Sequence, residues 1–101
     1  MGSLRRSAIL PEVPTVSEAG LQGFESGTWN GLLAPAGTPK EIVDRLYQQT
    51  TAALTDPKVR EWFAAQGANP VGSRPDEFAD FIASEIRRWA AVIERAGIKA
   101  D

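Results

Sequence analysis

Three segments of the sequence begin at a proline and then carry apolar residues at helical spacing. In the first, Thr38, Pro39 and Glu41 combine a helix cap, a proline suited to the first helical position and capping-box spacing. We expect a helix from about Pro39 to Thr55. Its apolar face comprises Ile42, Val43, Leu46, Tyr47, Thr50, Ala53 and Leu54.

Two further helices are expected after this one. Asp56-Pro57 repeats the cap and the proline, and Gly67 is suited to end this shorter helix in a left-handed conformation. The longest helix begins near Pro75 and stops at Gly97. Its apolar stripe comprises Phe78, Phe81, Ile82, Ile86, Trp89, Ala90, Ile93 and Ala96.

The sequence offers little sheet to cover these three apolar faces. Residues 27–34 are apolar toward their end and bounded by glycine and proline, which predicts a short strand buried on both sides. Residues 68–72 predict a second short strand, which Pro70 confines to a sheet edge. The backbone groups of a buried strand need neighbouring strands as hydrogen-bond partners. We therefore expect these residues to belong to a sheet whose other strands this sequence does not contain.

The N-terminal region has a different character. Pro11 and Pro14 favour an extended or turn-like path. The spacing of Thr15 and Glu18 is that of a capping box, so a single helical turn closed by Gly20 should follow.

Composition excludes several classes of function. The chain has 101 residues, enough for one small domain, and its 11 basic and 13 acidic residues are scattered, which argues against nucleic-acid binding. It has no cysteine and no histidine, so thiolate chemistry, zinc–thiolate sites and a histidine base are absent. We expect no cofactor and no metal site. No apolar run is long enough to span a bilayer, and we expect no signal peptide in this chain.

The remaining polar motifs fit structural roles better than catalysis. Serine and threonine lack a partner base, and the acids at 76, 77 and 80 suit a helix start or a solvated face. The turn at residues 34–39 can connect a strand to a helix without a ligand. Trp62 and Trp89 lie on apolar helix faces and are expected to pack in a core. Trp29, between two glycines, has the best chance of reaching a cleft.

The order of the motifs resembles one protein family. Residues 6–20, read as Arg-Ser-Ala-Ile-Leu-Pro-Glu-Val-Pro-Thr-Val-Ser-Glu-Ala-Gly, are similar to a segment of the Bug family, the periplasmic solute-binding proteins of tripartite tricarboxylate transporters. The resemblance continues through Ala-Pro-Ala-Gly-Thr-Pro at residues 34–39 and the Val71-Gly72 turn before the last helix. It covers almost the whole chain.

This resemblance implies an α/β fold in two lobes around a cleft, in a protein about three times this long. The chain would be the C-terminal third, a helix-rich fragment with three main helices and about two short strands. Residues 1–26 would form the end of the second lobe and the crossover segment. Residues 27–101 would form the C-terminal part of the first lobe.

The resemblance also implies a function without catalysis. The parent protein would be periplasmic, would bind a small organic anion such as a dicarboxylate or an amino acid, and would deliver it to membrane transporter subunits. Within this chain, Val13, Pro14 and Thr15 are the residues expected to face the cleft, together with Trp29. The fragment alone would bind weakly or not at all. The alternative hypothesis is a helical interaction module in which apolar faces pair between chains as a homo-oligomer.

Overall fold

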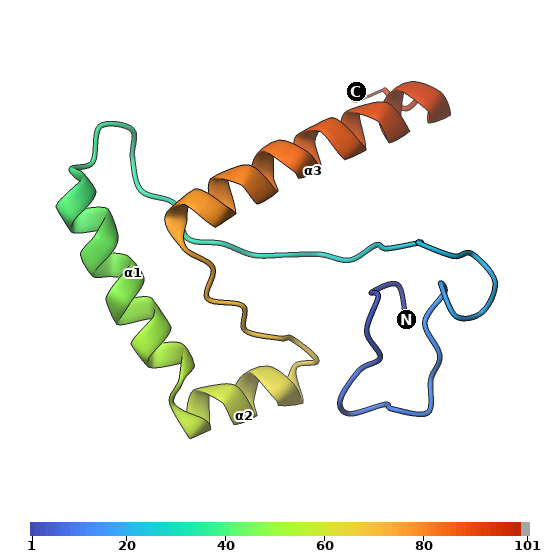
Figure 1. The fold of residues 1–101 in the computed structure, drawn as a ribbon, viewed down its shortest axis with the longest axis horizontal. Coiled ribbons are helices and arrows are strands. Elements are labelled where there is room, and N and C mark those ends of the chain that lie inside the picture. The colour runs from blue at the N-terminus through green and yellow to red at the C-terminus, as the bar shows by residue number, and fades with distance from the viewer. Residues whose placement is uncertain (100–101) are drawn as a thin grey trace.

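Three helices form where the proline-led segments predict them. The computed structural model describes residues 1–99, in the order α1 (Lys40–Leu54), α2 (Pro57–Ala65) and α3 (Pro75–Ala96). α1 and α2 meet at a corner, and a long extended segment runs from the N-terminal region past the start of α3 (Figure 1). α1 contacts both of the other helices. The helix bounds agree with the sequence prediction to within one or two residues.

Local signals account for most of the helix ends. The Asp56 carboxylate accepts a hydrogen bond from the Lys58 N–H at 2.8 Å, as a cap of α2 should. Gly67 and Gly97 follow α2 and α3 with φ of +73° and +66°, the left-handed conformation in which glycine carries no Cβ penalty. The expected single turn also forms, because the Ala19 N–H donates to the Thr15 carbonyl at 3.0 Å.

The predicted cap of α1 is wrong. The residue at the cap position is Pro39, with no side-chain cap bond, and the Thr38 hydroxyl instead donates to the Pro35 carbonyl at 2.6 Å. The hydroxyl is therefore committed to the preceding turn. A threonine just before a proline has this local alternative, which the capping-box pattern does not take into account.

The two expected strands do not form within residues 1–99. Residues 27–34 are extended, and in the described part of the chain none of them makes a backbone hydrogen bond to another residue. Leu32 and Leu33 are 80% and 79% exposed, although consecutive residues of an extended chain face opposite sides. Residues 68–72 are likewise irregular. The physical reason is that strand backbone needs a partner strand, and none lies alongside.

The three helices enclose no hydrophobic core. Thr15 is the one buried residue among those described. The Cα radius of gyration is 16.7 Å, against about 13 Å for a compact domain of about 100 residues. The expectation that Trp62 and Trp89 lie in a core is wrong for this chain, since Trp62 is 60% exposed and Trp89 is also exposed. No layer packs over the faces that carry them.

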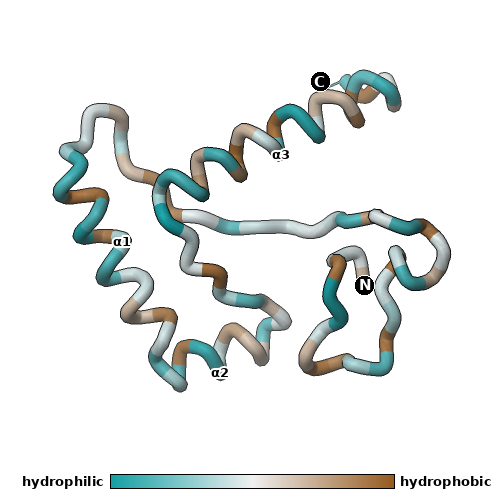
Figure 2. Tube along the Cα trace, viewed as in Figure 1, coloured by the Kyte–Doolittle hydropathy of each residue, from teal (hydrophilic) through white to brown (hydrophobic). Residues whose placement is uncertain are grey.

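Polar and apolar residues alternate along each helix, as the hydropathy-coloured trace shows (Figure 2). This is the pattern of helices that lay one face on a layer and turn the other to water. Among residues 1–99, no helix combines the length and the apolar character needed to cross a membrane.

Candidate functional site

The N-terminal region folds back on itself through backbone hydrogen bonds. The Val16 N–H donates to the Met1 carbonyl at 2.8 Å, and the Ser26 N–H donates to the Gly2 carbonyl at 2.8 Å. The Met1 ammonium group donates to the Pro14 carbonyl at 3.2 Å. These contacts hold the first residues against the segment in which the sequence predicts the ligand-facing loop.

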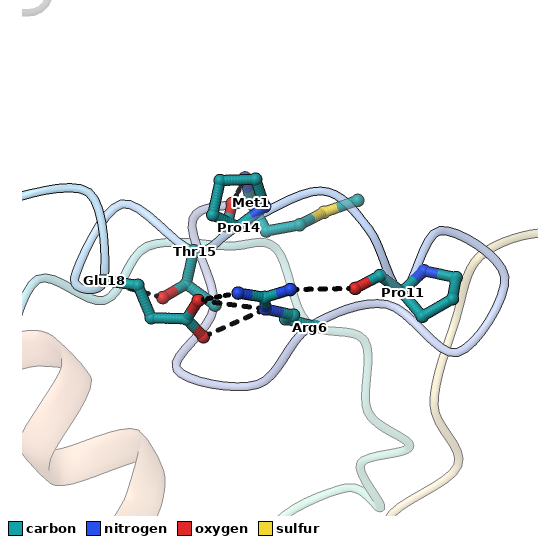
Figure 3. A network of polar contacts seen from close by, with 6 residues as sticks. All are labelled: Met1, Arg6, Pro11, Pro14, Thr15 and Glu18. Atoms are coloured by element: carbon teal, nitrogen blue, oxygen red, sulfur yellow. Dashed lines mark hydrogen bonds and ion pairs between the residues drawn. The ribbon is translucent and has the colours of Figure 1, made fainter.

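An ion pair closes the loop from residue 6 to residue 18. Arg6 Nε donates to Glu18 Oε2 at 2.9 Å and to Oε1 at 3.2 Å, and Arg6 Nη2 also pairs with Oε2. Arg6 Nη1 reaches across the loop and donates to the Pro11 carbonyl at 3.1 Å. Figure 3 shows this arrangement, with Thr15 beside Glu18. We call these four residues, Arg6, Pro11, Thr15 and Glu18, the Arg6 clasp.

The clasp keeps both of its charged groups ionised. The hydrogen bonds from Arg6 hold the pKa of the Glu18 carboxyl below its ordinary value, with help from the opposite charge and from Thr15 and against partial desolvation. The same hydrogen bonds raise the pKa of Arg6. Both side chains are partly exposed, so the pair is screened by water and salt. A carboxylate held in this way is a poor proton donor or acceptor near neutral pH.

Thr15 lies at the centre of the loop and is 1% exposed. Its hydroxyl accepts a hydrogen bond from the Glu18 N–H at 3.1 Å, and its carbonyl accepts one from the Ala19 N–H. In this conformation the side chain has no surface to offer a ligand. Thr15 supports the loop from within, as the first residue of a capped turn.

The other three predicted site residues lie in two places. Val13 and Pro14 are exposed on the loop, and the Pro14 carbonyl is engaged by Met1. Trp29 belongs to a separate aromatic cluster, in which its ring lies edge-on to Phe78 and Phe81 with centroid distances of 5.6 and 5.3 Å. Within this chain, Trp29 is therefore joined to the start of α3.

Two surface hollows in the described chain lie elsewhere. One, of about 220 Å³, opens between the N-terminal loop and the end of α2; its lining includes Arg5, Arg6, Ile9, Leu10 and Asn69. The other, also of about 220 Å³, lies between the end of α1 and residues 70–72. Neither is lined by Val13, Pro14, Thr15 or Trp29. Both hollows are open to solvent, so neither is an enclosed ligand pocket.

The arrangement can position and contact a ligand, and it contains little reactive chemistry. No group of three or more acidic residues gathers at metal-binding distance in the described chain. The Glu18 carboxyl, whose pKa is lowered, is tied to Arg6.

Sequence reasoning missed the Arg6 clasp. The sequence pattern assigns Glu18 to a capping box with Thr15, whereas its carboxylate pairs with Arg6, and a pair 12 residues apart has no helical or strand periodicity to reveal it. Their opposite charges around two prolines were the one available clue, since prolines favour a chain reversal.

A second unexpected group lies on α3, where the Trp89 indole N–H donates to Glu85 at 2.7 Å and Arg88 lies 5.3 Å from the Trp89 ring.

Comparison with known proteins identifies the family. Residues 2–98 match the family described as TctC, the tripartite tricarboxylate transporter family receptor. The chain belongs to this family. Relatives include protein BugT of Bordetella pertussis, 42% identical over 97% of this chain and 32% of BugT. The UPF0065 protein in the tcbD-tcbE intergenic region of Pseudomonas sp. is also 42% identical, over 98% of this chain and 30% of its own length.

Solved structures of the same type share the fold of the chain. The periplasmic binding protein BugD is 36% identical, with a TM-score of 0.83 over 99% of this chain and 34% of BugD. The structure described as R. palustris Rpa4515 with adipate is 35% identical, with a TM-score of 0.82 over 96% of this chain and 32% of its own. The open path of the helices is therefore also the path of the matching part of BugD and of the R. palustris protein. This TctC-family chain spans about a third of the length of these relatives.

Proposed function

We propose that this chain is part of an extracytoplasmic solute-binding receptor that captures a small carboxylate for a tripartite tricarboxylate transporter. The observation that carries the proposal is the family match over residues 2–98. The similarity to a structure solved with adipate favours a small organic acid, such as a dicarboxylate or an amino acid, as ligand. The partners are membrane transporter subunits, and the compartment of the whole protein is the periplasm.

The open packing supports a role as one portion of a two-lobe protein. Leu32 and Leu33 expose both sides of the extended segment, as expected of a strand whose sheet lies in another part of the receptor. In this proposal, residues 1–26 end the second lobe and include the crossover, and residues 27–101 form the C-terminal part of the first lobe. The 101 residues correspond to the C-terminal third.

The proposed ligand-facing surface is the loop at residues 13–15, with Trp29 contributing from the other segment. Val13 and Pro14 provide the exposed part, and buried Thr15 supports them. No proton transfer or bond cleavage is required for capture and delivery.

Calorimetry tests this function. Adipate, succinate, citrate and aspartate would be titrated into a receptor-length protein that carries this sequence and, separately, into the 101-residue chain. We expect saturable binding of at least one acid to the longer protein and weak or no binding to the chain alone. A longer protein that is folded yet silent across the panel would refute the carboxylate assignment.

A second candidate function is self-association through apolar faces. The supporting observation is that large apolar side chains remain exposed on all three helices, including Ile42, Trp62 and Ile86. Pairing of chains would remove this surface from water. Sedimentation over a range of concentrations distinguishes the two proposals, because a monomer with native-like tertiary structure contradicts the second.

A further inference from the structure

The loop from Arg6 to Glu18 has the features of a compact Ω-loop. It spans 13 residues, its ends are joined by an ion pair, and internal turns fill it. The Leu10 N–H donates to the Ser7 carbonyl at 3.2 Å, and the Val13 N–H donates to the Leu10 carbonyl at 3.1 Å. These contacts are made without help from the helices.

Arg6 is the residue that ties these parts together. All three guanidinium nitrogens are engaged, two by the Glu18 carboxylate and the third by the Pro11 carbonyl. A planar guanidinium can make these contacts at once because its N–H groups point in fixed, separate directions. An ammonium group offers its donors from a single point and cannot reproduce this geometry.

We propose that Arg6 is a positioning residue that holds residues 11–15 in one conformation before any ligand arrives. This inference rests on the proposed function, in which Val13 and Pro14 form the exposed crest of the loop and face the ligand. A loop already in its bound shape loses less conformational freedom on binding, so a ligand binds it more tightly. Arg6 acts through the loop: its guanidinium contacts the Glu18 carboxylate and the Pro11 carbonyl (Figure 3).

The neighbouring arginine provides a matched control. Arg5 lies beside Arg6 in sequence and is exposed, and in the part of the chain that the structure describes it makes no ion pair. Replacing Arg5 removes the same charge from nearly the same place. Any difference between the two replacements therefore reports the contacts of Arg6 and not the net charge.

Amide hydrogen exchange, followed by NMR on the 101-residue chain without ligand, tests the proposal. Arg6→Gln should accelerate exchange at Val13, Glu18 and Ala19 toward the rates of an open chain, while Arg5→Gln leaves these amides as they are. Arg6→Lys should restore slow exchange at Glu18 through the ion pair but leave Val13 fast, because the Pro11 contact is lost. The amides of α2 and α3 report whether each variant keeps its helices.

Two outcomes would overturn the proposal. One is unchanged exchange at all three loop amides in Arg6→Gln; the other is an equal effect from Arg5→Gln. Should Arg6→Gln lose its helices, Glu18→Gln opens the same clasp from the other side and is read by the same amides. Because no ligand is present, failure of the carboxylate-binding proposal leaves this measurement unaffected. In the longer receptor, weaker adipate binding by Arg6→Gln than by Arg5→Gln then connects the clasp to function.

Discussion

The indole ring of Trp29 meets the phenyl ring of Phe78 edge to face, with centroids 5.6 Å apart and ring planes at 88°. Phe81 adds a second edge-on contact to the same indole at 5.3 Å. This is the geometry favoured by the positive edge and negative face of aromatic rings. The cluster is the clearest connection between the extended segment and α3, and it depends on Gly31, where an added Cβ would overlap the Phe78 ring.

Gly31→Ala should therefore separate the extended segment from α3. The added methyl group forces the Phe78 ring aside. Overpacking of this kind lowers the free energy of unfolding by about 1–3 kcal/mol in a packed site, and we expect the lower end of this range at this exposed position. The Trp29 indole resonance in NMR spectra should move, while that of Trp62 stays in place. Gly27→Ala is the control, because nothing lies within 4 Å of a Cβ at that position. Equal shifts in the two variants would contradict the close approach.

Asp56→Ala should weaken α2 at its start. The carboxylate satisfies the Lys58 N–H, and loss of such a cap costs about 1 kcal/mol. Far-ultraviolet circular dichroism during thermal unfolding should show less helix and an earlier loss of it. Thr38→Ala is the informative comparison, because Thr38 does not cap α1. A larger effect at Thr38 than at Asp56 would show that the capping-box interpretation of the sequence was right after all.

The sequence predicted the helices well because their determinants are local. The bond from the Lys58 N–H to Asp56 and the left-handed glycines act within a few residues, so the pattern alone suffices. Even a local pattern can fail, as at Thr38, whose hydroxyl donates to the Pro35 carbonyl one turn earlier instead of capping α1. Local competition of this kind has no periodicity to reveal it.

The strands and the site depended on partners distant in sequence. Residues 27–34 have strand composition, yet a strand exists only when a second one lies alongside. The burial of Thr15 and the pairing of Arg6 with Glu18 arise from a chain reversal that no short pattern encodes. This is why the capping-box spacing predicted the turn that begins at Thr15, whereas no pattern predicted that Thr15 would be buried inside the loop.

Replacing Leu32 and Leu33 by serine should reduce any self-association of the isolated chain. Both side chains are about four-fifths exposed and present apolar surface on opposite sides of one segment. Sedimentation velocity should show more monomer in the double variant at equal concentration. Leu4→Ser, an exposed leucine in another segment, should have a smaller effect. A native chain that is already monomeric at high concentration would rule out association through this surface.

Acid should open the Arg6 clasp. The folded pKa of Glu18 lies below its ordinary value of 4.5, chiefly because of the hydrogen bonds from Arg6. A group with a depressed folded pKa stabilises the loop fully above its unfolded pKa, and this contribution is lost as the pH falls through the lower folded pKa. The loop should therefore keep its folded conformation from pH 7 to about pH 5 and open progressively below the ordinary pKa of a glutamate carboxyl. NMR titration of the Glu18 and Ala19 amides measures this transition directly.

Two variants identify the titrating group. Glu18→Gln should remove the transition, because a neutral amide cannot gain the proton, and at each pH its loop amides should exchange at the rate of an open chain. Glu12→Gln, in the same loop, should leave the transition where it was. A Glu18 carboxyl that titrates at the ordinary pKa in the native chain, with loop amides indifferent to its ionisation, would mean that the Arg6 contact seen in the structure does not persist in solution.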